Sequence, residues 1–590
     1  MQQHEATTGR DGARHAAPAA TTGVTPSTPP QVRATQTRAT AQGRLGAHDA
    51  RRWAERCATE LGRCRDRLDA ANVFPVADSD TGTNLWLTVS AGARAIDAAE
   101  RDGVGALQDF ARGALLAARG NSGIIASEYL RGFATGAARA DLDAPARAAH
   151  MLTVAASAAH DAVARPVPGT ILTAAASAAA AAVACERRGG SLTDVLDAAV
   201  DGAREALLGS PEQLDVLAAN GVLDAGAYGL TIMLAALRDV VVEREGERED
   251  ADLPADLHVA VPRAREGRVP AGAPAAAGNA AASHGPEAAP DGAFEVMYVV
   301  ETDPDDDDRD LARRLRGSLE RTGESVVVVG GDGVWQVHVH TDDPAAALDA
   351  APAGRLRQVC VRHLVARGED EPGADVRAAV GVVAGVRSPG LLAEAAGTGA
   401  VVLARTDRSW TPDELARVLE DAGRDRVVAV LRRDSTATLR RTLHRLPRVA
   451  VDMIVVPDDV HVVAALAARE EALDAGADAG AALAAMRAAV DALVWVSVDL
   501  DAPGGPVPDG RTGSQTDDGS AADPRVLGAL GDLAARVRPG GVGLAMVLVG
   551  GRVPPGVVAR CETTLRDDVG LEVLTLASGR RDAVVRVGAL

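Results

Sequence analysis

Residues 72–84 read Asn-Val-Phe-Pro-Val-Ala-Asp-Ser-Asp-Thr-Gly-Thr-Asn and follow a predicted helix. Two carboxylates, Asp78 and Asp80, alternate with small polar residues, and a helix start follows at Thr83 and Asn84. Carboxylates placed this closely repel one another unless water or a cation relieves the charge. Mg²⁺ is commonly held by one or two carboxylates together with substrate phosphates. The stretch therefore indicates a Mg²⁺-nucleotide loop, with a turn that only caps a helix as the alternative.

The composition excludes several kinds of chemistry. All 62 basic residues are arginine, because the sequence contains no lysine. A P-loop lysine, a Schiff base and a Ser-Lys dyad are therefore excluded. The net charge of −20 argues against binding of nucleic acid or of an anionic membrane surface. Five scattered cysteines are typical of a reducing compartment, so we expect a cytoplasmic protein with thiols in its core.

The N-terminal region and the apolar runs bear on targeting and on membrane insertion. Residues 1–45 are rich in Thr, Pro and Ala and lack an apolar signal region, which predicts a disordered tail. No apolar run approaches the roughly 20 residues that span a bilayer, so we expect no stable membrane insertion.

The remaining chain divides by periodicity. Helical spacing dominates residues 46–242, which predicts an all-α domain, and a linker rich in charged residues, Ala, Gly and Pro follows over residues 243–292. Strand patterns with one helix over residues 293–367 predict a small α+β domain. Strands and helices then alternate over residues 368–590, which predicts a parallel sheet with crossover helices. A polar segment over residues 499–523 interrupts this last domain.

Three further polar loops begin predicted helices in the all-α domain. They are Arg119–Gly123, Pro168–Ile171 and Asn220–Gly226. Helix N-termini offer free N–H groups and the positive end of the helix dipole, so they attract phosphate. Glycine in such loops lets the backbone approach an anion closely. Together with residues 72–84, these loops favour a nucleotide site over ordinary turns.

These motifs resemble those of the ATP-binding subunit of bacterial fatty acid kinase. Residues 72–84 are followed, in the family's order, by Ala118-Arg-Gly-Asn-Ser-Gly-Ile-Ile, Pro168-Gly-Thr-Ile-Leu-Thr and Gly221-Val-Leu-Asp-Ala-Gly. The resemblance covers about residues 46–240, and the family's kinase domain is similar to the L domain of dihydroxyacetone kinase. It implies a DhaL-like barrel of eight antiparallel helices that binds ATP or ADP and two Mg²⁺ ions at one end.

The resemblance also implies roles by position. Asp78 and Asp80 would ligate Mg²⁺, with Asn72 near the metals. Contacts to the nucleotide are implied for Thr81, Thr83, Asn84, Asn121, Ser122, Gly123, Thr170, Asp224 and Gly226. Arg119 is a candidate for stabilising charge in the transition state, with a surface or salt-bridged role as the alternative. Ser79 stands where relatives commonly have Gly, which matters only if residue 79 adopts a positive φ.

A second motif, Val337-His-Val-His-Thr-Asp-Asp-Pro, lies on a predicted strand. His338 and His340 are two residues apart, so both imidazoles face the same side. They indicate a metal site or a catalytic acid/base pair, with an exposed hydrogen-bonded pair as the alternative. The family pairs these histidines with a cysteine, at a position where this sequence has Met297, and a thioether is a poor Zn²⁺ ligand. Either the site has lost its thiolate or Cys360, on a nearby predicted strand, replaces it.

The C-terminal region resembles the family's third domain, which is similar to the DegV-like fatty-acid-binding partner. The resemblance implies an ATP-dependent kinase subunit that phosphorylates the carboxylate of a fatty acid presented by a separate DegV-like carrier, and it implies a homodimer. Two alternatives stay open. One is a dihydroxyacetone-kinase-like subunit, and the other is a nucleotide-binding regulatory protein without transfer.

Overall fold

The computed structural model describes residues 45–75, 77, 79–96, 102–245, 292–302, 308–331, 333–351, 355–364, 374–404, 409–422, 425–444, 446, 449–501, 523–537 and 543–589. The predicted tail up to residue 44, the linker over residues 246–291 and most of the polar segment, residues 502–522, lie outside the described residues.

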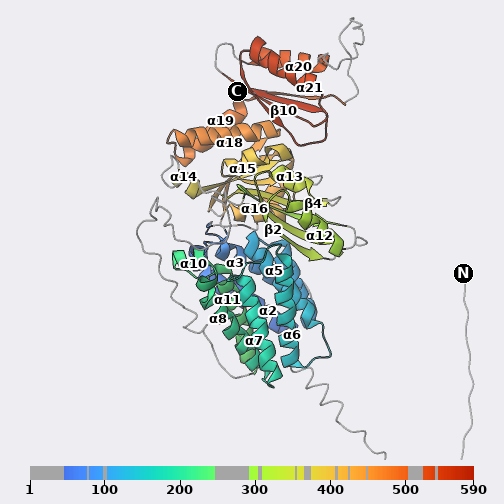
Figure 1. The fold of residues 1–590 in the computed structure, drawn as a ribbon. Helices are drawn as coiled ribbons and strands as arrows, with labels where there is room; N and C mark the ends of the chain where they lie inside the picture. Colours follow the sequence, from blue (N-terminus) through green and yellow to red (C-terminus); the bar gives the residue numbers. More distant parts are fainter. Residues whose placement is uncertain are drawn as a thin grey trace, which may run out of the picture. The chain divides into compact units, whose positions relative to one another are not determined.

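Residues 45–245 form a helical domain (Figure 1). Its eight long helices are α2 (Ala47–Ala70), α3 (Thr81–Ile96), α4 (Gly103–Leu116), α5 (Gly120–Ala137), α6 (Ala144–Ala162), α7 (Ile171–Arg187), α8 (Leu192–Leu208) and α11 (Ala225–Glu245). Two short helices, α9 (Ser210–Gln213) and α10 (Asp215–Asn220), precede α11. No named strand lies in the described part of this domain, so the all-α prediction is confirmed.

The helical core is built around few aromatic side chains. Trp53 is buried, contacts the rings of Phe110 and Phe133, and donates from Nε1 to the carbonyl oxygen of Met233 at 2.9 Å. Alanine is the commonest residue type in this core, and its small side chain allows the helices to approach closely.

Helix α11 is the most buried of these helices. Its segment Ala225–Arg244 is long and apolar enough to cross a membrane by length and composition, and 94% of that window is buried inside the protein. The expectation that no apolar run approaches the length of a membrane span is wrong for this segment. Such burial is typical of the core helix of a bundle.

The strands of residues 292–456 form one eight-stranded sheet, in the order β2-β3-β1-β4-β6-β5-β7-β8. They are β1 (Phe294–Glu301), β2 (Glu324–Gly331), β3 (Val334–Thr341), β4 (Arg355–His363), β5 (Val380–Val386), β6 (Val401–Ala404), β7 (Arg426–Arg432) and β8 (Ala450–Val456). The first four are antiparallel neighbours, whereas β5 is parallel to β6 and β7, and β7 is parallel to β8. The parallel sheet predicted for residues 368–590 is present in β5 to β8, but the prediction is wrong for residues 494–589, whose strands form a separate sheet with two antiparallel pairings.

The pairing of β4 with β6 is not expected from the predicted division into domains. These strands pair antiparallel, with Cys360 opposite Leu403 and Val361 opposite Val402. The expected boundary between residues 367 and 368 therefore does not separate two sheets. Periodicity could not reveal this, because each strand pattern is local and pairing across a long connection leaves no signal in the spacing.

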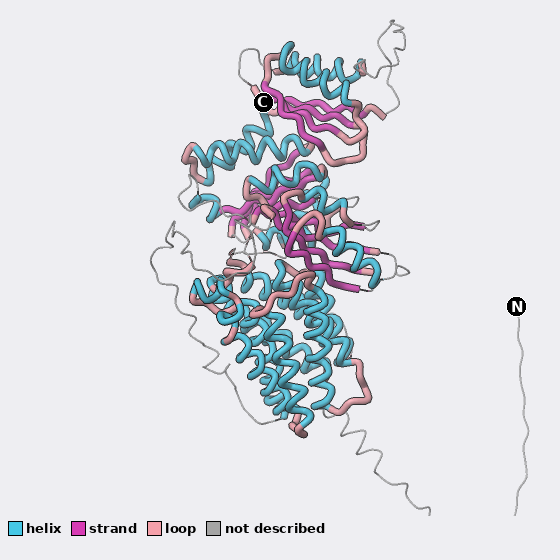
Figure 2. The backbone as a smooth tube through the Cα atoms, viewed as in Figure 1, coloured by secondary structure: helices cyan, strands magenta, loops and turns pink. Residues whose placement is uncertain are grey.

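Helices flank this sheet (Figure 2). They are α12 (Asp308–Leu319), α13 (Pro344–Asp349), α14 (Ala374–Ala379), α15 (Leu392–Gly397), α16 (Pro412–Asp421), α17 (Thr436–Leu443), α18 (Asp459–Asp474) and α19 (Ala479–Ala492). A second sheet has the order β11-β10-β12-β9, from β9 (Val494–Asp499), β10 (Leu544–Val549), β11 (Glu572–Ala577) and β12 (Val584–Ala589), with helices α20 (Pro524–Arg536) and α21 (Pro555–Thr563).

One face of the antiparallel strands packs on the helical domain. The apolar side chains at this contact are Leu115, Ala118, Ile124, Ala162, Met297, Val327 and Val329. In addition, the backbone N–H of Ala164 donates to the carbonyl oxygen of Val326 at 3.4 Å, beside a bridge between Val163 and Val327. The contact places the edge strand β2 against the end of the helical domain that contains the predicted nucleotide loops.

Candidate functional site

A cavity of about 260 Å³ lies where the helical domain meets β2. From the helical domain it is lined by Phe74, Pro75, Thr81, Asn121, Ser122, Ile125, Val163, Ala164, Arg165, Val167, Thr170, Ile171, Leu172, Asp224 and Gly226. From the segment leading into β2 and from the strand itself it is lined by Glu320 and residues Gly323–Val327. Apolar and polar side chains thus share its wall, as is usual for small-molecule sites.

Four helices begin at this cavity. Lining residues come from the first turn of α3, of α5, of α7 and of α11, and these are the four loop-to-helix junctions predicted from the sequence. Each helix start contributes N–H groups and a positive dipole end. Their convergence favours an anion such as phosphate, while the carboxylates of Asp224, Glu320 and Glu324 in the same lining oppose it.

The residues present fit a nucleotide. Within the described chain, the buried Oδ1 of Asn121 has no hydrogen-bond partner, although Asn121 lines the cavity. A buried acceptor without a donor costs free energy, which a donor group of a bound molecule would recover. A ribose hydroxyl or the amino group of a nucleobase can supply such a donor.

The hydroxyl groups at the start of α3 and α5 are linked. The hydroxyl of Thr81 donates to Oδ1 of Asn72 at 2.5 Å and lies 3.3 Å from the hydroxyl oxygen of Ser122. Asn72 and Thr81 are buried. The structure thus brings these three predicted site residues together.

Asp80 accepts two hydrogen bonds with its two carboxylate oxygens. Oδ1 accepts from Asn84 Nδ2 at 2.7 Å, and Oδ2 accepts from Arg362 Nη2 of β4 at 3.2 Å. Burial raises the pKa of Asp80, and the positive charge of Arg362 opposes that rise. Its predicted partner Asp78 lies outside the described residues. Asp80 and the amide oxygen of Asn72 are hard oxygen donors, which suit Mg²⁺.

Two backbone positions shape this end of the helical domain. Ser79 has φ +55°, so the residue that replaces the family's common Gly does adopt the left-handed conformation. Gly120 has φ +56°, and a Cβ atom added there would lie 2.3 Å from Asn84 Nδ2. Only glycine fits at position 120, and this brings the start of α5 next to the side chain that holds Asp80.

Three predicted contact residues do not line the cavity among the described residues: Asn84, which donates to Asp80, together with Thr83 and Gly123. The backbone N–H and the hydroxyl of Thr83 donate to the carboxylate of Asp69 at 2.9 and 2.7 Å, and Thr83 does not line the cavity among the described residues. Gly123 also lies outside the lining, and a Cβ atom there would lie 2.4 Å from Thr88 Oγ1. The hydrogen bonds of Thr83 support the packing of α3 on α2, and the absence of a side chain at Gly123 allows α5 to approach α3.

Arg119 forms salt bridges in the structure, which is the alternative role considered for it. Its side chain is 5% exposed, pairs with Glu420 at 2.9 Å, and forms a short ion pair with Asp421, both on α16. Arg119 does not line the cavity in the described structure. The guanidinium therefore joins two parts of the chain, and its proposed role in the transition state is not supported by its position.

Thr170 and Asp224 line the cavity as helix caps. Thr170 is the N-cap of α7, and Asp224 Oδ1 accepts from the backbone N–H of Ala227 in α11 at 2.6 Å. Burial raises the pKa of Asp224 to about 6, against hydrogen bonds from the backbone of Ala227 and Ile171. The carboxylate is thus poised to change charge close to neutral pH.

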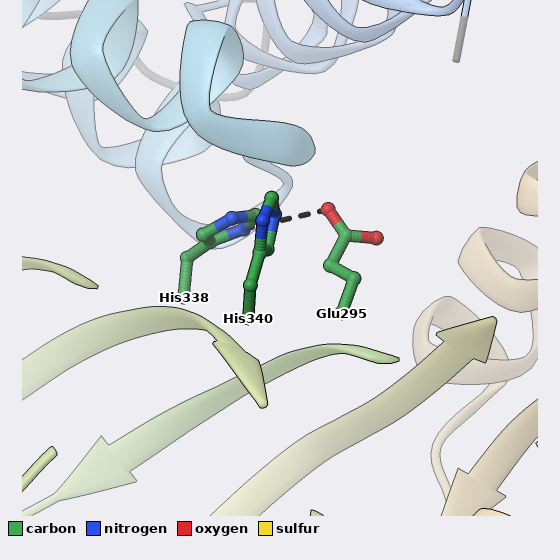
Figure 3. Close-up of side chains that lie close together, drawn as sticks. All are labelled: Glu295, His338 and His340. Carbon is green, nitrogen blue, oxygen red and sulfur yellow. Dashed lines mark ion pairs between the residues drawn. The ribbon is translucent and has the colours of Figure 1, made fainter. Parts of the chain in front are cut away.

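The histidine pair forms a second group of polar side chains. Figure 3 shows the rings of His338 and His340 side by side, 4.9 Å between centroids, with the carboxylate of Glu295 directed toward them. Glu295 Oε1 lies 3.4 Å from His338 Nδ1. All three side chains are buried, so the alternative of an exposed pair is wrong.

Glu295 is a site residue that was not predicted from the sequence. The group of described residues whose ligand atoms lie within 4.8 Å of one another contains Glu295, His338 and His340. Cys360 is not in this group, although it lies opposite Met297 on the neighbouring strand. The signal was available, because Glu295 is two residues from Met297 and so shares its face of β1.

The electrostatics of this group favour neutral imidazole. Burial lowers the pKa of His338 well below its ordinary value, and the charges of His340 and Arg362 lower it further. Within the described residues, neither ring nitrogen of His338 has a hydrogen-bond partner. A neutral imidazole at His338 beside the carboxylate of Glu295 can ligate a transition metal, so a metal site is chemically possible without the thiolate.

Family comparisons agree with this geometry. Residues 75–239 match the family model of the DAK2 domain, and residues 291–370 match that of the FakA-like middle domain of fatty acid kinase. The resemblance to the fatty acid kinase family is confirmed. The cavity therefore lies where the DAK2 domain meets the FakA-like middle domain.

Relatives match only part of the chain. Protein YloV of Bacillus subtilis (strain 168) is 28% identical over 317 residues, which are 52% of this chain and 53% of YloV. An uncharacterised protein of Staphylococcus aureus (strain USA300) is 32% identical over 200 residues, which are 33% of this chain and 36% of that protein. The chain thus spans about half the length, or less, of these curated relatives.

Solved structures show weaker likeness. The dihydroxyacetone kinase from C. freundii in complex with AMP-PNP and Mg²⁺ has a TM-score of 0.29 and 13% identity, covering 39% of this chain and 50% of that chain. The DegV family protein Cg2579 from Corynebacterium glutamicum has a TM-score of 0.27 and 13% identity, covering 36% of this chain and 97% of that chain. At TM-scores this low, neither structure informs the function of this chain.

Replacement of Ser79 tests the strain in the acidic loop. The left-handed conformation costs a residue with a Cβ atom roughly 1–2 kcal/mol, and glycine loses about 0.5–1 kcal/mol more conformational entropy on folding. We expect Ser79→Gly to raise the unfolding free energy by about 0.5–1 kcal/mol in urea titrations. Ser79→Ala is the matched control, and an equal gain from alanine would contradict this explanation.

Substitution of Asp224 tests its raised pKa. A group whose pKa is raised by folding stabilises the protein most at low pH and loses that contribution as the pH rises through its folded pKa. Between about pH 4 and pH 7, wild type should lose up to about 3 kcal/mol of unfolding free energy relative to Asp224→Asn. Urea titrations across this range measure the difference. Asp161→Asn, at an exposed carboxylate, should keep the wild-type pH dependence.

Removal of the Arg119 charge separates its two suggested roles. Arg119→Met removes the short ion pair of Asp421, whose side chain is 7% exposed, and leaves the longer contact with Arg417 at 3.8 Å. Because a buried carboxylate that loses its closest positive partner is costly, we expect the unfolding free energy to fall by up to about 3 kcal/mol in urea titrations. Arg139→Met, at an exposed side chain whose partner Asp141 is also exposed, is the control. A variant as stable as wild type that has lost phosphoryl transfer would instead establish a catalytic role.

Proposed function

We propose that the chain is an ATP-dependent kinase subunit that phosphorylates the carboxylate of a fatty acid presented by a separate lipid-binding protein. The observation that carries this proposal is the convergence of four helix N-termini on one cavity, with Asp80 beside Thr81 at the start of α3. The matches to the DAK2 and FakA-like families support a kinase-type phosphotransferase.

The cavity wall suits the two parts of a nucleotide. Apolar side chains such as Phe74, Ile125 and Ile171 can contact a nucleobase. The hydroxyls of Thr81 and Ser122, with the N–H groups of their helix starts, can orient phosphate oxygens. Phosphoryl transfer depends mainly on such positioning and on neutralisation of charge.

The acidic loop would hold the metal. Asp80, with Asn72 nearby and Asp78 in the same loop, is the donor set proposed for Mg²⁺. When bound, Mg²⁺ supplies positive charge to the β- and γ-phosphates. In a chain without lysine, this charge and the helix N-termini replace the lysine of a P-loop.

A carboxylate acceptor needs little further chemistry. It is already ionised at neutral pH, so its oxygen can attack the γ-phosphorus without a general base. The new oxygen–phosphorus bond forms while the bond from the γ-phosphorus to the bridging oxygen breaks, giving an acyl phosphate and ADP. The acyl chain is poorly soluble in water, which is why a carrier must present it.

Partner, assembly and location belong to the same proposal. We expect a DegV-like carrier as partner, a homodimer as the assembly and a cytoplasmic location, and the family resemblance supports all three. The histidine group, now with Glu295 as third member, is proposed to act in the middle domain as a metal or acid/base site.

Substitution of Asp80 tests the proposal. The full chain is incubated with ATP labelled at the γ-phosphate and with lipid-binding proteins loaded with fatty acid, and acyl phosphate formation is measured. Asp80→Asn keeps the size of the side chain and one acceptor oxygen but removes the charge, so we expect turnover to fall by at least about 100-fold. Asp66→Asn, whose carboxylate is 86% exposed, is the control.

The outcomes separate the alternatives. Full activity of Asp80→Asn would show that the metal assignment is wrong. Phosphorylation of dihydroxyacetone rather than a carrier-bound lipid would favour the glycerone-kinase alternative. Tight Mg²⁺-dependent nucleotide binding without transfer to any carrier would favour the regulatory alternative.

A further inference from the structure

Arg362 joins the two polar groups of the molecule. It lies on β4, and its guanidinium contacts both Asp80 in the acidic loop and Glu295 on β1. Its side chain is 24% exposed, Asp80 is 23% exposed and Glu295 is 4% exposed. Glu295 in turn faces His338 (Figure 3). One arginine therefore connects the acidic loop to the histidine group.

The two ends of this bridge are unequal. Glu295 Oε2 accepts from Arg362 Nε at 2.6 Å and also contacts Nη2 at 2.5 Å. Asp80 Oδ2 is contacted by Nη2 alone, at 3.2 Å. Short contacts from two nitrogens hold an arginine more strongly than one long contact. The hydrogen bond from Arg362 to Asp80 is therefore the weaker of the two contacts and breaks first.

Arg362 occupies the position of a counter-ion. Asp80 Oδ1 already accepts from Asn84, and Arg362 takes the other oxygen. A partly buried carboxylate needs such a positive partner when no cation is present. When a cation binds Asp80, the positive charge of Arg362 repels that cation. Asp80 then no longer needs Arg362 to balance its charge.

We propose that Arg362 is a positioning residue that acts as the counter-ion of Asp80 until Mg²⁺·nucleotide binds and is then held by Glu295 alone. The inference rests on the proposed function, because it requires Asp80 to receive the metal. It makes Arg362 a competitor of the metal. It also makes Glu295 the residue that sets how strongly Arg362 competes.

This arrangement predicts opposite effects for two neutral substitutions. In Arg362→Gln the competing charge is absent, so less Mg²⁺ is needed. In Glu295→Gln the arginine loses its stronger partner and stays on Asp80, so more Mg²⁺ is needed. Removal of a purely structural ion pair would instead weaken binding in both variants.

The test measures Mg²⁺-dependent binding of a fluorescent ADP analogue to the full chain. Mg²⁺ is the chosen probe because it prefers oxygen donors and does not favour the histidine group. We expect the half-saturating Mg²⁺ concentration to fall at least about fivefold in Arg362→Gln and to rise at least about fivefold in Glu295→Gln. In the double variant the effect of Glu295→Gln should largely disappear, because it acts through Arg362.

Other results would overturn the inference. If Arg362→Gln weakens nucleotide binding with and without Mg²⁺, the arginine binds phosphate directly. If Arg362→Gln leaves the Mg²⁺ dependence unchanged, Arg362 is not the counter-ion. Circular dichroism shows whether each variant folds. If Arg362→Gln does not fold, Glu295→Gln alone decides the question. Unchanged or tighter Mg²⁺ binding by Glu295→Gln would exclude the counter-ion role.

The controls keep this test separate from the proposed function. Arg362→Lys retains the charge and should stay near the wild-type Mg²⁺ requirement, so a shift as large as that of the Gln variant would contradict the charge mechanism. If wild type binds no nucleotide in the presence of Mg²⁺, the proposed function fails first. If wild type binds and the two Gln variants shift in the same direction, only the role of Arg362 fails.

Discussion

Buried and partly buried charges hold the helical domain on the large sheet, and the site depends on them. Arg119 pairs with two carboxylates of α16, Arg417 of the same helix donates to backbone carbonyl oxygens at the end of α4, and Arg362 reaches the acidic loop. Loss of one partner from such a pair leaves an uncompensated charge away from water, which is strongly unfavourable. This constraint fixes β2 against four helix N-termini and so defines the cavity.

Local patterns predicted much of the molecule. The four helix starts, the acidic loop and the all-α character of residues 46–242 follow from spacing, glycine and short polar side chains, and the structure confirms the helix starts within a few residues. The site contacts that depend on distant segments could not be predicted this way. The salt bridges of Arg119, the placement of β2 beside the cavity and the contact of Arg362 with Asp80 join residues far apart in sequence.

The middle domain shows why a motif can mislead when one residue changes. The sequence has Met297 at the position where the family has cysteine. The sequence therefore suggests Cys360 as a substitute for that thiolate. The structure instead directs the carboxylate of Glu295 at the histidines. A missing ligand is better sought first on the same face of the same strand, because residues two apart share that face.

The position of β2 has a consequence for producing the sheet domain on its own. β2 is an edge strand of the eight-stranded sheet, and the segment after α6 covers part of its free edge through Val163 and Ala164. The apolar face formed by Met297, Val327 and Val329 is covered by the same domain. If the sheet were produced without the helices, this edge and this face would meet water together. Exposed edges of this kind recruit strands from other molecules, so the sheet domain alone is prone to aggregate.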